Sequence, residues 1–287
     1  MSDVLLLRWG AWQPQGPVQV DWSNPITRSL VGAWIFNVKN PLNLVGAPAL
    51  QSVNNSPGNS SMYSGPGGFG LEWTLQNITV SNTLGTSGAA SLAISTTANT
   101  TVWGMLRGFG AATTATCWTI DSATASHRWS ISLPYSDGNY YFDFAGLTAG
   151  QTRLTGVAPG TTSYSVFAAV GSILVGTSQL MQLYQNGIQV ATQTWTSASA
   201  AARVDANENF NLGGGASINL NSDLSATYFL WHFNRALSQQ EASYITQYPY
   251  SILRPTPTLA GNLGRFSVKG AAASSGSGAM LLTGCGP

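Results

Sequence analysis

Apolar and polar residues alternate in short runs along most of this sequence, and turn-forming residues separate the runs. An alternation with a period of two is typical of β-strands that bury one face. The runs are TLQNITV, TTVWGML, CWTIDS, HRWSISL, YYFDFAG, SYSVFAAVGSIL and LSATYFLWHF, together with the more continuously apolar SLVGAWIF at residues 29–36. The pattern predicts an all-β protein built from many short strands.

Two tight turns are predicted between such runs. Asn186-Gly187 separates MQLYQ from IQVATQ, and both central residues of a type I′ hairpin turn need a positive φ, which Asn and Gly adopt most readily. Asp137-Gly138 is also expected in a tight hairpin turn, since Gly supplies the positive φ that such turns need. Each pair therefore predicts a hairpin of adjacent antiparallel strands.

One helix is predicted, within RALSQQEASYITQYP at residues 235–249. Ser238 and Glu241 have the spacing of a capping box, in which each side chain accepts a hydrogen bond from the backbone N–H of the other residue. Ile245 and Tyr248 are expected on the apolar side of the helix, and Pro249 is expected to end it.

Composition and charge exclude several classes of protein. Charged residues form 7% of the chain and the formal net charge is +1, so no basic face for nucleic acid is expected. A hydrophobic content of 44% excludes a charge-driven disordered chain. Asp3 stands where a signal peptide carries positive charge, and the apolar stretch 166–176 is too short to cross a bilayer. Cys117 and Cys285 are expected to stay unpaired.

The titratable residues do not form a recognisable catalytic pattern. Glycoside hydrolysis needs two carboxylates on either side of one bond, but no glutamate has an acidic residue two or four positions away. The three glutamates are Glu72, Glu208 and Glu241. Asp143, like the other aspartates near strand ends, is expected to be a turn residue. His232 lies in an alternating run and is expected to hydrogen-bond a backbone partner. The sequence therefore predicts no enzyme.

The loop VDANENF is a candidate calcium site, because hard oxygen ligands cluster there. The candidate ligands are Asp205, Asn207, Glu208 and Asn209. An ordinary polar turn explains the same residues, and no group of Cys and His has zinc spacing. No metal or cofactor is expected.

Three segments, in this order, resemble the laminin-G-like or concanavalin A-like jelly roll of bacteriophage virion proteins: NPITRSLVGAWIF, LYQNGIQVA and YFLWHFNRALSQQEASYITQYPYSILRP. The resemblance implies two antiparallel sheets packed face to face. The expected fold is a two-sheet jelly-roll sandwich at residues 23–255, with one short helix near its C-terminal end. An extended N-terminal arm at 1–22 and a C-terminal extension at 256–287 are expected to flank it, although both ends folding back as edge strands is an alternative.

The resemblance also implies a function. The expected role is a non-enzymatic structural component of a phage virion, such as a capsid-decoration, minor head or tail-associated protein, made in the host cytoplasm and attached through its terminal arms. The partners would be other virion proteins, with homo-oligomers in the assembly, and low charge suits large interfaces. The expected assembly contacts are Trp9, Trp12, Trp22, Met280, Leu281 and Leu282.

The alternative function is a carbohydrate-binding or host-receptor-binding module, in which exposed aromatic rings stack on sugars. Five of the ten tryptophans lie in predicted strands and are expected in the core: Trp34, Trp103, Trp118, Trp129 and Trp231. The glycan contacts predicted among the rest are Trp73 and Trp195.

Overall fold

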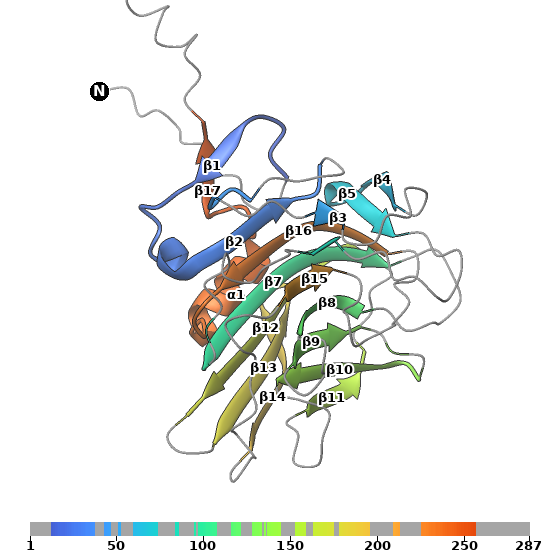
Figure 1. Cartoon of the computed structure of the whole chain (residues 1–287), viewed down its shortest axis with the longest axis vertical. Helices are drawn as coiled ribbons and strands as arrows, with labels where there is room; N and C mark the ends of the chain where they lie inside the picture. The colour runs from blue at the N-terminus through green and yellow to red at the C-terminus, as the bar shows by residue number, and fades with distance from the viewer. Residues whose placement is uncertain are drawn as a thin grey trace, which may run out of the picture. The chain divides into compact units, whose positions relative to one another are not determined.

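The computed structural model describes residues 13–37, 43–46, 51–52, 60–73, 84–85, 95, 97–107, 116–121, 128–133, 135, 137–144, 153–158, 163–174, 178–195, 209–212 and 225–256. Contacts divide the chain into two units, Met1–Arg254 and Pro255–Pro287. The two large sheets and the α-helix belong to the first unit (Figure 1). No helix among the described residues is long and apolar enough to cross a membrane.

Two antiparallel sheets form the body of the first unit. The larger has the order β14 (Ile188–Trp195), β13 (Gln179–Gln185), β12 (Ser165–Ile173), β7 (Ala98–Arg107), β16 (Ser225–Phe233), β5 (Gly68–Trp73) and β4 (Ser60–Gly65), and β2 (Leu30–Ile35) also pairs with β16. The smaller has the order β11 (Arg153–Val157), β10 (Asn139–Phe144), β9 (Arg128–Ser132), β8 (Thr116–Asp121), β15 (Asn209–Leu212), β6 (Leu84–Gly85) and β3 (Gln51–Ser52). The predicted all-β, two-sheet sandwich is confirmed.

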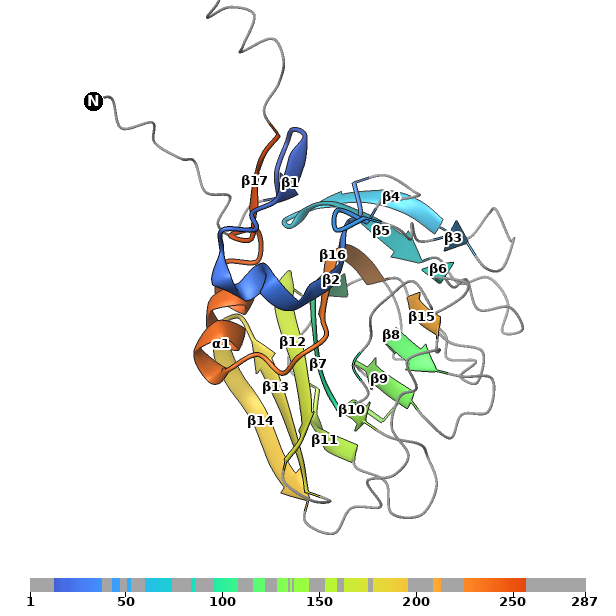
Figure 2. The same ribbon diagram turned by 60° about the vertical axis from the view of Figure 1, so that its left-hand side comes forward.

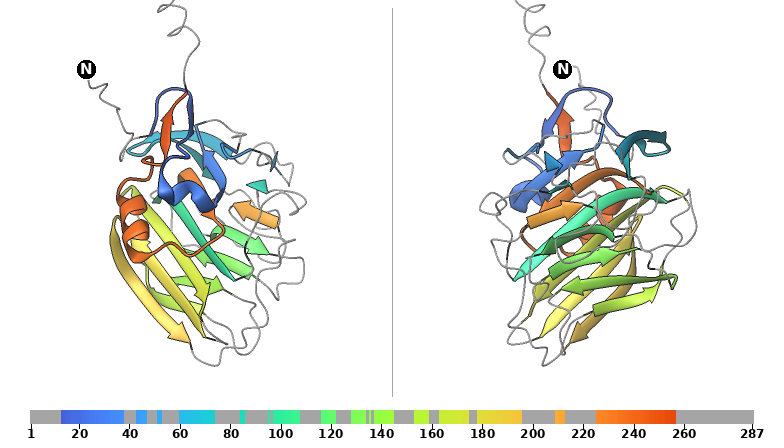
Figure 3. Two further views of the ribbon diagram at one scale, coloured as in Figure 1. Left: turned by 90° about the vertical axis from the view of Figure 1, so that its left-hand side faces the viewer. Right: turned by 45° about the vertical axis from the view of Figure 1, so that its right-hand side comes forward.

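The central strands of the eight-stranded sheet are buried on both faces. One face packs against the seven-stranded sheet (Figure 3), and there the Trp103 ring contacts that of Trp118 from the other sheet and stacks on Phe167 of its own sheet. The other face is covered by the helix α1 (Gln239–Gln247) and by the 3₁₀-helix η1 (Pro25–Ser29), with Trp231 and Ile245 in its apolar cluster (Figure 2). A strand that is buried on both faces needs apolar residues at consecutive positions, which explains the run of large apolar residues at 228–231 within β16.

The five tryptophans expected in the core are all buried, as predicted. Trp129 lies at the centre of the space between the sheets, with its ring centroid 4.4 Å from that of Phe144 and 5.0 Å from that of Phe142. Gly171 on β12 permits this packing, because a Cβ atom there would lie 2.2 Å from the Trp129 ring. A larger residue at 171 would push the sheets apart.

Both predicted turns are confirmed. Asn186 has a φ of 48° and Gly187 a φ of 89°, as a type I′ turn requires between β13 and β14. A contact with α1 also stabilises the turn, because the Gly187 N–H donates to Thr246 Oγ1 on that helix at 2.9 Å. Gly138 has a φ of 82° in the connection between β9 and β10.

The capping box of α1 is confirmed. Ser238 Oγ accepts from the Glu241 N–H, and Glu241 Oε2 accepts from the Ser238 N–H at 2.9 Å. Hydrogen bonds from Arg235 hold the pKa of Glu241 at about 2. Tyr248 differs from the prediction, since it is 40% exposed and not on the apolar side. The helix ends at Gln247, and Tyr248, with a φ of −128°, has already left the helical path.

The described end of the expected N-terminal arm packs against the sandwich. The amide of Gln13 pairs with the backbone of Phe69, since Nε2 donates to the carbonyl and Oε1 accepts from the N–H, both at 2.7 Å. Val20 is buried, and β1 (Val18–Val20) pairs with β17 (Leu253–Pro255). Residues 13–22 thus lie on the sandwich, whereas residues 1–12 and 257–287 fall outside the described residues. The domain boundaries after residues 22 and 255 stay predictions.

Candidate functional site

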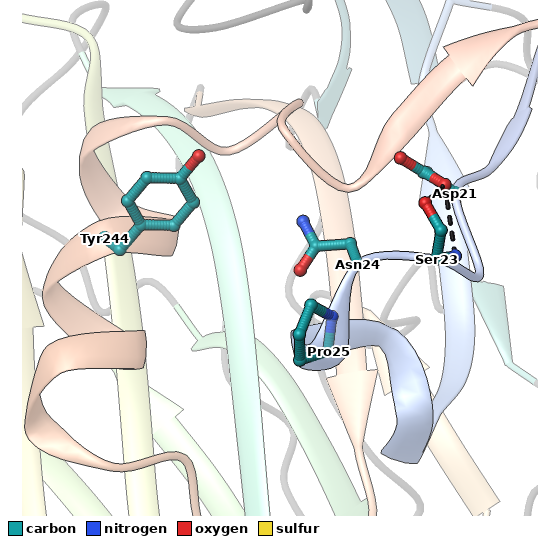
Figure 4. A pocket seen from close by; sticks show the side chains of 5 residues that line it. All are labelled: Asp21, Ser23, Asn24, Pro25 and Tyr244. Carbon is teal, nitrogen blue, oxygen red and sulfur yellow. Dashed lines mark hydrogen bonds between the residues drawn. The ribbon is translucent and has the colours of Figure 1, made fainter.

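A small open pocket lies between η1 and α1, on the face of the eight-stranded sheet that the helix covers (Figure 4). Its volume is about 200 Å³. We call it the α1 pocket. The residues that line it are Asp21, Ser23, Asn24, Pro25 and Tyr244. Four of them come from the segment that precedes η1 or begins it, and Tyr244 reaches toward them from the helix.

Local hydrogen bonds fix the wall that the N-terminal segment supplies. Asn24 Oδ1 caps η1 by accepting from the Ile26 N–H at 3.1 Å, and Asn24 Nδ2 donates to the Ser251 carbonyl at 3.3 Å. Asp21 Oδ1 accepts from the N–H and the hydroxyl of Ser23, at 3.1 and 2.6 Å. This wall of the pocket is therefore positioned by its own backbone and side chains.

The opposite wall is aromatic. Tyr244 is 38% exposed, and its ring centroid lies 5.4 Å from that of Tyr248. Tyr244 lies in the last turn of α1 and Tyr248 at its C-cap, so the two rings form one exposed aromatic surface at the end of the helix. Trp22, an expected assembly contact, is 52% exposed in the neighbouring segment.

The polar groups of the pocket are incompletely paired. Within the described part of the chain, neither Asp21 Oδ2 nor the Tyr244 hydroxyl makes a hydrogen bond. The pocket thus offers one carboxylate oxygen as an acceptor and one phenol as a donor or acceptor. The residues that line it include no basic side chain. Such a site suits a ligand that carries hydroxyl groups and an apolar face.

A second polar cluster lies on the outer face of the seven-stranded sheet. Phe142 and Phe144 of β10 point into the core, so the alternate residues Tyr141 and Asp143 face outward. Together with residues of the β9–β10 connection and of β11 they form the β10–β11 cluster: Tyr135, Asp137, Tyr141, Asp143 and Arg153.

The β10–β11 cluster is closed by its own contacts. Arg153 donates to both carboxylate oxygens of Asp143, at 2.5 and 3.0 Å, and lies 4.9 Å from the centre of the Tyr141 ring. The Tyr141 hydroxyl donates to Asp137 Oδ2, which raises the pKa of Tyr141 and lowers that of Asp137. Asp143, expected to be a turn residue, instead lies inside β10 opposite Arg153 and is 3% exposed. This cluster joins two strands and leaves little for a ligand.

His232 is fully buried in the core, where a side chain, that of Thr101, is one partner of its ring. Its Nδ1 lies 2.9 Å from Thr101 Oγ1, which also accepts a hydrogen bond from the Trp129 indole. Burial lowers the pKa of His232 to about 3, so the ring is neutral at ordinary pH. It does not line the α1 pocket. Among the described residues, no three His, Cys, Asp or Glu side chains are grouped as metal ligands.

The structure places the other predicted site residues as follows. Trp195 packs half-buried against the core between the sheets, so its ring is only partly available to a glycan. Trp73 lies in β5, but its side chain falls outside the described residues. Also outside are five of the six expected assembly contacts and three candidate calcium ligands: Trp9, Trp12, Met280, Leu281, Leu282, Asp205, Asn207 and Glu208. The fourth candidate calcium ligand, Asn209, lies in β15, and its side chain is not described.

Sequence reasoning missed the α1 pocket. Ser23-Asn24-Pro25 is a turn-forming sequence, and Tyr244 and Tyr248 stand four residues apart in the predicted helix. Nothing in the sequence brings the two segments together, because they are separated by most of the chain. The spacing of the two tyrosines was the only signal of an exposed aromatic surface.

The fold has distant counterparts among solved structures, although no protein-family model and no curated protein matches the sequence. The carbohydrate-binding module CBM40 of Ruminococcus gnavus IT-sialidase, bound to α2,6-sialyllactose, is 13% identical with a TM-score of 0.43, over 53% of this chain and 84% of that one. The binding domain of botulinum neurotoxin DC, in complex with rat synaptotagmin II, is 12% identical with a TM-score of 0.48, over 77% of this chain and 52% of that one. A leech intramolecular trans-sialidase is 15% identical with a TM-score of 0.42, over 53% of this chain and 24% of that one. These values are too low to carry over any ligand or activity.

Proposed function

We propose that this chain is a non-catalytic binding module of the β-sandwich class, and that its ligand is a carbohydrate held in the α1 pocket. One observation carries the proposal. An exposed tyrosine ring stands across an open pocket from a carboxylate that has one oxygen without a hydrogen bond in the described part of the chain. Ligand sites commonly combine an apolar wall with a few convergent polar groups.

The chemistry of a sugar matches the two walls. A pyranose ring has an apolar face of C–H groups, which packs on the electron-rich face of an aromatic ring. Its hydroxyl groups donate to a carboxylate, and hydrogen bonds to a charged acceptor are about twice as strong as neutral ones. Tyr244 would take the face of the sugar and Asp21 would accept from its hydroxyls.

The test is a glycan array probed with the full chain, followed by titration calorimetry with the soluble oligosaccharide that gives the strongest signal. Tyr244→Ala and Asp21→Ala are expected to weaken binding by about tenfold each, as the loss of one good contact does. Tyr141→Ala, in the closed β10–β11 cluster, is the matched control and should bind as the wild type does. If the array shows no binding, or if both pocket variants bind normally, the proposal is wrong.

The sequence resemblance favours a second candidate, a structural component of a phage virion that displays the sandwich and attaches through its ends. None of the three solved structures described above is a virion protein. A glycan-binding sandwich and a virion protein are compatible, since a displayed module can contact the host surface.

The structure sharpens the experiment for this second candidate. Because Gln13 holds Phe69 and β1 pairs with β17, deletion of residues 1–22 would also damage the sandwich. Deletion of residues 1–12 or 257–287 is therefore the cleaner variant. A truncated chain that folds but no longer assembles with virion proteins would support attachment through the ends, and normal incorporation of both truncations would contradict it.

A further inference from the structure

The strand β14 forms one end of the eight-stranded sheet, and among the described strands none pairs with its outer edge. An unpaired strand edge presents a row of free backbone N–H and C=O groups, which can pair with a strand of another chain. Many side chains along β14 are exposed to solvent. Ile188 is 69% exposed, Val190 is 42% exposed, and Thr192, Gln193 and Thr194 are exposed as well.

Proteins usually protect such edges with charged residues, proline, a short strand or a bulge. β14 has eight residues and contains no charged residue and no proline. The neutral stretch is much longer than the strand, because no Asp, Glu, Lys, Arg or His occurs from Leu154 to Ala202. The pairing of β13 with β14 has one register shift, between Leu183 and Tyr184, which lies near the hairpin turn. The segment Ala191–Trp195 remains regular, neutral and unprotected.

The strand at one end of the other sheet provides a contrast. β11 also ends its sheet, but it carries Arg153, whose guanidinium is paired with Asp143. β11 is also short, with five residues. A charged residue on a short strand is one of the usual protections against edge pairing. The absence of both devices on β14 therefore distinguishes it from an ordinary edge.

We propose that β14 pairs antiparallel with β14 of a second copy of this chain, across a two-fold axis at the edge of the eight-stranded sheet. The occupant is a second copy because an antiparallel strand pair is self-complementary, as a two-fold interface requires. Nothing repels the second copy, since the strand is neutral and the net charge of the chain is only +1. Pairing about Gln193 places Thr192 of one copy beside Thr194 of the other on the same face.

The arrangement has a geometric consequence. A two-fold axis that relates antiparallel neighbours in one sheet stands perpendicular to that sheet, so both copies present the same face on the same side. α1 and the α1 pocket lie on one face of the eight-stranded sheet. The dimer would therefore hold two α1 pockets toward one surface. This consequence, unlike the dimer, rests on the proposed function.

The test introduces charged residues at the proposed interface and measures the oligomeric state of the full chain by sedimentation. In one variant Thr192 and Thr194 are both replaced by Lys, and in another both are replaced by Glu. The wild type is expected to be a dimer and each variant a monomer, because like charges directly opposite in a strand pair repel. An equimolar mixture of the two variants should form dimers again. A wild type that is monomeric, or a mixture that does not re-form dimers, would overturn the proposal.

The matched control is the same charge change on the other edge strand. Thr155 and Val157 are exposed on one face of β11, and their replacement by Lys should leave the dimer intact. Circular dichroism checks that every variant is folded. Dissociation of the β11 variant would place the interface elsewhere and would also overturn the proposal.

The link to the α1 pocket is tested separately. The folded monomeric variants are expected to bind a soluble oligosaccharide as the wild type does, but to bind the same oligosaccharide on a dense surface about a hundredfold more weakly, because linked sites gain from effective concentration. If no oligosaccharide binds to any form, the proposed function fails while the dimer stands. If surface binding is equal for monomer and dimer, the two pockets do not act together and this part of the proposal is wrong.

Discussion

The α1 pocket and the β10–β11 cluster contain the same kinds of side chain but differ in how completely these are paired. Each brings tyrosine rings close to aspartates. In the β10–β11 cluster every carboxylate has a partner within the cluster, and Asp143 is almost fully buried. In the α1 pocket one Asp21 oxygen and the Tyr244 hydroxyl lie open to a ligand. The comparison teaches that pairing and exposure, and not residue type, separate a structural cluster from a candidate binding site.

The largest effect is expected from Arg153→Ala in the closed cluster. The substitution leaves the buried Asp143 carboxylate without its bidentate partner, which should lower the free energy of unfolding by about 3 kcal/mol. Urea unfolding measures the change, and Arg153→Lys, which keeps the charge, should lose less. Binding at the α1 pocket should not change. A loss below about 1 kcal/mol, as for a surface ion pair, would mean that the cluster is not structural.

Acid should destabilise the core that both sites share, and this background must be measured before the sites are compared at low pH. The pKa of His232 is lowered to about 3 in the folded chain, whereas an unfolded histidine titrates near 6.5. The unfolded state therefore takes up a proton first, and stability is lost as the pH falls below 6.5, by about 1.4 kcal/mol per unit.

His232→Gln isolates this contribution. The variant is expected to be less stable at neutral pH, because it disturbs the contact with Thr101, but its stability should fall less steeply between pH 6.5 and pH 4. Thermal melts across that range give the two slopes. Equal slopes would contradict the assignment of the acid sensitivity to His232.

A pair of matched substitutions separates the two sites directly. Asp21→Asn should weaken oligosaccharide binding by about tenfold and change stability by less than about 0.5 kcal/mol, since the carboxylate lies at the surface. Asp143→Asn should do the reverse, with a clear loss of stability and unchanged binding. Titration calorimetry and urea unfolding on both variants provide the comparison. The same pattern of losses in both variants would remove the distinction between the sites.

The smallest effect is expected at the cap of the helix that carries Tyr244. The pKa of Glu241 is lowered to about 2, so its contribution to stability is present above pH 4.5 and is lost as the pH falls from 4.5 toward 2. Glu241→Gln should cost about 0.5–1 kcal/mol at pH 7, as expected for a partly exposed ion pair and cap, and should have little effect at pH 2. Amide exchange in α1 should rise in the variant at pH 7. An unchanged helix would mean that packing, and not the cap, holds Tyr244 in place.

The features that the sequence predicted well are set by neighbouring residues. The Asn186-Gly187 turn and the Ser238–Glu241 capping box depend on contacts within four positions, and both are confirmed. The pairing of Asp143 with Arg153 was not predicted, because it depends on the register of β10 against β11. The α1 pocket was out of reach for the same reason, since Asp21 and Tyr244 meet only after the whole sandwich has formed. Contacts between neighbouring residues thus determine the turn and the helix cap, whereas the pairing of distant segments determines the two sites.

The position of β16 determines when this protein can complete its fold during synthesis. β16 comes from residues 225–233, near the end of the described chain, yet it lies between β7 on one side and β2 and β5 on the other. Until β16 leaves the ribosome, the earlier strands β2, β5 and β7 cannot form the pairs that they make with it in the finished sheet. Sheets closed by such distant segments fold slowly and leave apolar edges open in the meantime. A nascent chain that stalls before residue 225 would therefore be prone to aggregate, however stable the finished sandwich is.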